Sequence, residues 1–145
     1  MFVVSYSPES DLWSRLPEVA LRDGGVPRLV WTGREALLLQ NGAPGAAFDP
    51  ARQAWRSLAA VPEGRPFADA AVWTGDLVLL WSGGEEGLAY NPESDVWSTF
   101  DAGGQESRGS AVVAWADGWF VGWGGFTTGR SMDYQNDGIR YRPPG

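Results

Sequence analysis

The stretch YNPESDVW, residues 90–97, combines two aromatic residues with a turn-forming Asn-Pro dipeptide. The same arrangement, an aromatic, a polar residue and a proline with a tryptophan seven positions after the aromatic, recurs every 42 positions. The three aromatic–tryptophan pairs are Tyr6 with Trp13, Phe48 with Trp55 and Tyr90 with Trp97. Ser, Asp or Asn before Pro starts a turn, because its side chain bonds back to the backbone and Pro fixes φ. A period of about 40 residues is typical of repeat folds.

Two further landmarks recur in step with this turn. A Trp-Thr-Gly tripeptide and a diglycine after an apolar run each return in the later copies, with a weaker match in one copy of each. The tripeptides begin at Trp31, Trp73 and, in weaker form, Trp115; the diglycines are Gly83-Gly84 and Gly124-Gly125, with Asn41-Gly42 in the first copy. Tyr141 starts a fourth copy. We expect the aromatic residues to pack in the core and the glycines to permit a backbone conformation or close approach that a Cβ would block.

Each period contains four short apolar runs separated by turn signals. In the middle copy these runs are residues 68–73, 77–81, 87–90 and 96–100, and a Gly-containing hairpin turn at 74–76 joins the first two. No segment carries a 3.6-residue apolar period over three turns, so helix should be nearly absent. The sequence therefore predicts an all-β fold built from four-stranded antiparallel meanders.

The diglycine after an apolar strand, the aromatic-polar-Pro turn and the following tryptophan resemble kelch repeats. The recurring Trp-Thr-Gly is similar to bacterial kelch proteins grouped with the galactose oxidase central domain. The resemblance implies a β-propeller of four-stranded blades, here a single segment over residues 1–145 with repeats at about 6–47, 48–89 and 90–140 and the start of a fourth at 141. A β-sandwich with coincidental aromatic spacing is the alternative.

The composition excludes several classes of function. The chain has 18 acidic and 11 basic residues, a net charge of −7 and no run of basic residues, which argues against nucleic acid as a partner. It has no Cys and no His, so the copper radical oxidase activity of some kelch relatives, which uses a Tyr linked to a Cys with His ligands, does not carry over. We expect no cofactor, no bound metal and no membrane span. We do not expect the N-terminal residues to form a signal peptide, and a secreted or periplasmic location stays open if the chain is part of a longer one.

Three repeats are fewer than the 4 to 8 blades of a typical propeller. Residues 2–16 are expected to supply the third and fourth strands of one blade, and residues 110–142 the first three strands of another. Two explanations are open. The chain is a fragment of a longer kelch protein, or two copies form a homodimer that closes a six-bladed ring.

Candidate ligand-binding residues lie on the loops that join consecutive blades or second to third strands. They are Arg65, Arg108, Arg130, Asp133 and Tyr134, with Arg22 or Arg28 as a first-copy equivalent of the arginines. An arginine there can bind a carboxylate or sugar, or bond neighbouring loop carbonyls. The longest loop, 126–139, loosely matches a calcium loop at Asp133, Gln135 and Asp137, but a solvated polar loop is the preferred interpretation. Glu85 and Glu86 are not expected to form a catalytic pair, because sequence neighbours on a turn tend to point apart.

The sequence favours a non-catalytic propeller segment that binds a protein or carbohydrate ligand. The alternative is part of a secreted or periplasmic carbohydrate-active enzyme whose catalytic residues lie mostly outside this chain. Because propellers that share a fold differ in activity, the choice depends on the geometry of a site.

Overall fold

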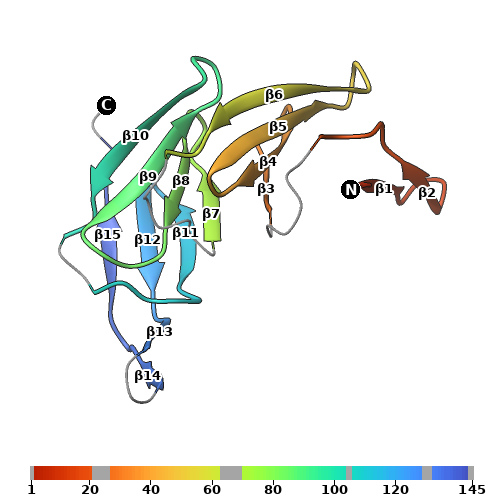
Figure 1. Ribbon diagram of the computed structural model, residues 1–145. Helices are drawn as coiled ribbons and strands as arrows, with labels where there is room; N and C mark the ends of the chain where they lie inside the picture. The colour runs from red at the N-terminus through yellow and green to blue at the C-terminus, as the bar shows by residue number, and fades with distance from the viewer. Residues whose placement is uncertain (1, 21–26, 63–69, 104–105, 129–131, 144–145) are drawn as a thin grey trace. The chain divides into compact units, whose positions relative to one another are not determined.

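The computed structural model describes residues 2–20, 27–62, 70–103, 106–128 and 132–143. The described residues form antiparallel β-sheets and contain no helix (Figure 1), as the apolar pattern predicts. None of them belongs to a helix that is long and apolar enough to cross a membrane. The chain separates into two compact units, residues 1–61 and 62–145.

The described residues of the first unit form two sheets. A hairpin is formed by β1 (Val4–Ser7) and β2 (Leu12–Arg15), and a four-stranded sheet has the order β3 (Arg28–Trp31), β4 (Ala36–Gln40), β5 (Ala43–Asp49) and β6 (Ala54–Ala60). Leu38 and Ala46 of the larger sheet form a small core with Val19, and Trp55 packs against it. The Trp55 indole N–H donates to the Pro17 carbonyl at 2.9 Å.

In the second unit, the part of the chain that the structure describes forms three sheets. The four-stranded sheet has the sequential order β7 (Ala70–Trp73), β8 (Val78–Trp81), β9 (Glu86–Asn91) and β10 (Val96–Asp101). A three-stranded sheet joins β11 (Val112–Ala116), β12 (Trp119–Trp123) and β15 (Gly138–Tyr141), and a hairpin is formed by β13 (Phe126–Thr128) and β14 (Met132–Tyr134). These bounds confirm the four strands expected for the middle copy, except that residues 68 and 69 lie outside the described part.

The core of the second unit lies between its two larger sheets. Phe100 stacks on Tyr141 with ring centroids 4.4 Å apart and meets Phe120 edge to face at 5.5 Å. Glycines make room for the large rings. A Cβ on Gly122 would lie 2.5 Å from the Trp81 ring, and one on Gly87 would overlap the ring of Phe100. Aromatic rings therefore pack directly against glycine backbone on strands β9 and β12.

The 42-residue repeat has one local geometry in its three copies. Tyr6 pairs with Trp13, Phe48 with Trp55 and Tyr90 with Trp97 across adjacent strands, and the ring centroids are 5.0, 5.0 and 4.7 Å apart. In each turn the residue two positions before the tryptophan has a positive φ of 52° to 58°; these residues are Asp11, Gln53 and Asp95. Equivalent sequences thus adopt equivalent hairpins.

The polar residue before proline acts as predicted in two copies. Asp49 Oδ1 accepts the backbone N–H groups of Ala51 and Arg52 at 2.8 and 3.1 Å, and Asn91 Oδ1 accepts those of residues 93 and 94 at 2.9 and 3.1 Å. The threonines of the Trp-Thr-Gly tripeptides have a matching role. Thr32 Oγ1 and Thr74 Oγ1 each accept the backbone N–H three residues later at 3.0 Å. Short polar side chains therefore close both kinds of turn.

Residues 126–139 differ from the expectation of a polar loop. That prediction is wrong for β13 and β14, which form a hairpin that projects beyond the ends of β12 and β15 in Figure 1. The hairpin begins where Phe126 N–H donates to the Gly109 carbonyl and Gly109 N–H donates to the Phe126 carbonyl, at 3.0 and 2.9 Å. The Gln135 amide then bonds Thr127 Oγ1 at 3.3 Å. Backbone pairing with a distant segment gives this insertion a regular structure that its polar composition did not indicate.

Candidate functional site

The diglycine segment after β8 forms one wall of a cleft. Gly83 and Gly84 both have a positive φ, 80° and 89°, and a Cβ on Gly83 would overlap the backbone of Arg108. Two hydrogen bonds hold the segments together, from Arg108 N–H to the Ser82 carbonyl at 2.9 Å and from Gly84 N–H to the Glu106 carbonyl at 3.0 Å. The glycines therefore allow both the conformation and the close approach expected of them, and they bring the β8–β9 and β10–β11 loops side by side.

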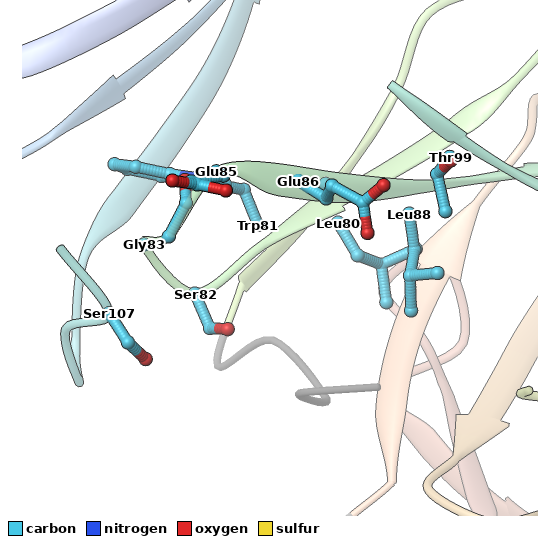
Figure 2. A pocket seen from close by; sticks show the side chains of 11 residues that line it. Leu80, Trp81, Ser82, Gly83, Glu85, Glu86, Leu88, Thr99 and Ser107 are labelled. Carbon is cyan, nitrogen blue, oxygen red and sulfur yellow. The ribbon is translucent and has the colours of Figure 1, made fainter. Parts of the chain in front are cut away.

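The cleft has a volume of about 260 Å³ and lies within the second unit (Figure 2). Its floor is apolar, formed by Trp81, Leu80 and Leu88, which are all buried. Hydroxyl and carboxylate groups line its sides: Ser82, Ser107, Thr99, Glu85 and Glu86. A second hollow shares Glu85, Glu86 and Thr99 and extends the cleft toward Asp101 and Gly103. The cleft therefore lies on the loops on which the sequence places a site, but none of its polar lining residues is among the predicted ligand-binding residues.

The two neighbouring glutamates of the cleft diverge. In Figure 2 the Glu85 carboxylate lies at the Trp81 end and the Glu86 carboxylate lies toward Leu80 and Leu88. Both side chains are exposed at the start of β9, where successive side chains point to opposite faces of a sheet. The two carboxylates therefore do not act on one bond from opposite sides, in agreement with the expectation that they point apart.

Arg108 is buried, with 5% of its surface exposed, and its guanidinium contacts neighbouring loops. Its Nη1 donates to the Gly124 carbonyl at 3.2 Å and to Asp137 Oδ1 at 2.6 Å, and its Cζ lies 5.8 Å from the centroid of the Trp81 ring. These contacts match the second interpretation of this arginine, in which it bonds loop carbonyls. Arg108 thus supports the wall of the cleft from behind.

The other selected residues are not gathered at the cleft. Asp133 and Tyr134 are exposed on β14, and Tyr134 meets Phe126 edge to face at 6.3 Å. Asp137, the third position of the loose calcium-loop match, is engaged by Arg108. Arg65 and Arg130 lie outside the described residues, as does Arg22, so their roles stay predictions.

The cleft residues could not be recognised from type or spacing. The Glu85-Glu86 pair and Ser82 are near one another in the sequence, but the other two hydroxyl residues, Thr99 and Ser107, come from β10 and from the loop before β11. The diglycine was the available signal, because it marks the point at which two loops approach each other closely.

Comparison with known proteins adds no family. A scan of the chain against protein-family models found no match, and a search of curated proteins found none either.

Proposed function

We propose that this chain is part of a kelch-type β-propeller and acts as a non-catalytic scaffold that binds a protein or carbohydrate ligand. The cleft between the β8–β9 and β10–β11 loops carries the proposal. Three hydroxyl groups and two carboxylates line the sides of this cleft above an apolar floor. This arrangement suits hydrogen bonding to a polar ligand. The divergent carboxylates support binding over hydrolysis, because a glycosidase needs two carboxyl groups that flank one bond.

The kelch-type assignment is supported by the repeated geometry. The three aromatic–tryptophan hairpins share a register, a ring separation and a positive-φ residue at the same place. Diglycines with a positive φ at both positions occur after β8 and after β12. The two four-stranded sheets have the sequential strand order of a propeller blade.

A propeller segment needs neighbours for its apolar surfaces. The hairpin β1–β2 exposes Tyr6, Leu12 and Trp13, and Trp13 is 69% exposed. The three-stranded sheet exposes Val112 and Trp123. Because so many apolar side chains are exposed, we expect a partner to cover them. This partner is either further blades of a longer chain or a second copy that forms a homodimer.

The binding proposal is tested with a glycan array and a peptide array, together with a turnover assay on every glycan that binds. Glu85→Gln removes a cleft carboxylate with little change of shape, and Glu93→Gln, on the exposed turn after β9, is the matched control. We expect binding without turnover, weakened by Glu85→Gln and unchanged by Glu93→Gln. Turnover by the chain alone would refute a non-catalytic role. Binding that both variants leave intact would refute the proposal that the ligand binds in this cleft.

A further inference from the structure

Another hollow of the second unit lies apart from the cleft and from its extension, where the β7–β8 turn faces the β11–β12 turn. Its volume is about 450 Å³. Strands β7 and β11 are in contact, and residues of the β7–β8 and β11–β12 turns line the same hollow. The lining residues are Thr74, Asp76, Leu77, Trp115, Gly118, Arg142 and Pro143. We call this hollow the turn groove.

The turn groove has one cationic wall. The Arg142 guanidinium lies 5.5 Å from the centroid of the Trp119 ring, and the Arg140 guanidinium lies 5.0 Å from the same centroid. Within the described part of the chain, neither arginine forms an ion pair. Two guanidinium groups that share one indole repel each other, and an anion beside Arg142 would relieve this repulsion. Stacking also orients a planar guanidinium for a bidentate bond to a carboxylate.

The opposite wall is polar and carries a negative charge. Thr74 Oγ1 accepts the N–H groups of Asp76 and Leu77 at 3.3 and 3.0 Å, so its hydroxyl proton is available to donate outward. The Asp76 carboxylate is exposed and accepts hydrogen bonds. A carboxylate there disfavours a ligand with several negative charges, and it favours one that presents hydroxyl groups on this side.

The floor between the two walls is apolar. Trp115 packs against the core of the unit and is half-buried where it lines the groove, beside Leu77 and Pro143. Aromatic and aliphatic surface of this kind suits the C–H face of a sugar ring. From the three surfaces together we propose that the turn groove binds a monoanionic, hydroxylated ring, a uronic acid. Its carboxylate bonds Arg142, its hydroxyl groups bond Thr74 and Asp76, and its ring lies on Trp115.

The test measures binding of D-glucuronate and of D-glucose by saturation-transfer NMR and calorimetry. We expect glucuronate to bind more tightly than glucose, which lacks the carboxylate. Arg142→Gln should weaken the binding of glucuronate roughly ten- to a hundredfold, the typical range for loss of a hydrogen bond to a charged group. Arg34→Gln is the control for loss of a positive charge, because Arg34 is exposed in the β3–β4 turn of the first unit and does not line the groove. Circular dichroism of each variant checks that it is folded.

The anionic wall is tested separately with Asp76→Asn and glucose 6-phosphate, whose phosphate carries about two negative charges. We expect this variant to gain affinity for the phosphate sugar relative to glucuronate. Equal affinity for glucuronate and glucose, undetectable glucuronate binding, or full binding by folded Arg142→Gln would each overturn the proposal. None of these results bears on the cleft, since the two sites share no residue.

Discussion

The two glycines that follow β8 should respond differently to the same substitution. Both have a positive φ, so alanine at either position costs about 1 to 2 kcal/mol of folding free energy from the left-handed conformation. A Cβ on Gly84 would meet no atom within 4 Å. A Cβ on Gly83 would lie 2.6 Å from the Glu106 carbonyl oxygen and would overlap the backbone of Arg108.

The overlap at Gly83 adds two costs. Forcing the two loops apart costs about 1 to 3 kcal/mol, as other overpacked sites do, and loss of the Arg108 to Ser82 backbone hydrogen bond adds about 1 kcal/mol. We therefore expect Gly83→Ala to destabilise the chain by about 3 to 6 kcal/mol and Gly84→Ala by about 1 to 2 kcal/mol.

Urea unfolding followed by tryptophan fluorescence measures both values, with the slope m as a check that the denatured state is unchanged. Gly33→Ala is a further control, because Gly33 has a φ of 87° in open space at an unrelated turn. Equal losses at Gly83 and Gly84, or a larger loss at Gly84, would refute the close approach between the two loops and with it this wall of the cleft.

Three other perturbations test the aromatic pairs, their Tyr–Asp hydrogen bonds and one ion pair. Trp97 is half-buried against buried Tyr90, whereas Trp13 is mostly exposed. Trp97→Ala should therefore lower the free energy of unfolding by about 3 kcal/mol and Trp13→Ala by less than about 1 kcal/mol, as measured by thermal or urea unfolding. Equal losses of stability would contradict this difference in burial. Tyr90→Phe should cost about 0.5 to 1.5 kcal/mol through loss of its 2.6 Å bond to Asp95, and Tyr6→Phe, whose bond to Asp11 is exposed, should have almost no effect. Arg56 donates two hydrogen bonds to the Glu35 carboxylate and holds the pKa of Glu35 below its ordinary value. Stability from this pair is therefore present above the unfolded pKa of about 4.3 and is lost as pH falls through the lower folded pKa. The difference in unfolding free energy between wild type and Glu35→Gln should be constant from about pH 6 to 8 and should shrink as the pH falls below the unfolded pKa.

The local turns were predictable from sequence because their causes are local. Asp49 and Asn91 bond the backbone two and three residues ahead, which needs only the residue type and the following proline. Gly83 and Gly84 were recognised for the same reason, since a diglycine after an apolar strand marks an unusual backbone conformation.

The features that could not be predicted from sequence depend on contacts between segments that are distant along the chain. Gly122 and Gly87 leave room for the rings of Trp81 and Phe100, and no spacing rule states which glycine faces which ring. Arg108 and Asp137 are 29 positions apart, and their ion pair exists because the β12–β15 connection returns to the diglycine segment. The β13–β14 hairpin likewise depends on backbone pairing between Phe126 and Gly109.

The burial of the aromatic pairs could not be predicted from local sequence either. Tyr6 with Trp13 and Tyr90 with Trp97 have nearly the same local geometry, yet Tyr90 is buried and Tyr6 is exposed. The difference comes from what covers each sheet, which a local sequence does not specify.

One sequence repeat produces one hairpin geometry three times in this chain. Cross-strand nuclear Overhauser effects in protein labelled at its aromatic residues measure this directly. We expect contacts between the rings of Tyr6 and Trp13, Phe48 and Trp55, and Tyr90 and Trp97, and the corresponding backbone contacts between paired strands. If any of these tryptophans contacts a different strand partner in place of the aromatic seven residues before it, the three copies do not share one hairpin geometry.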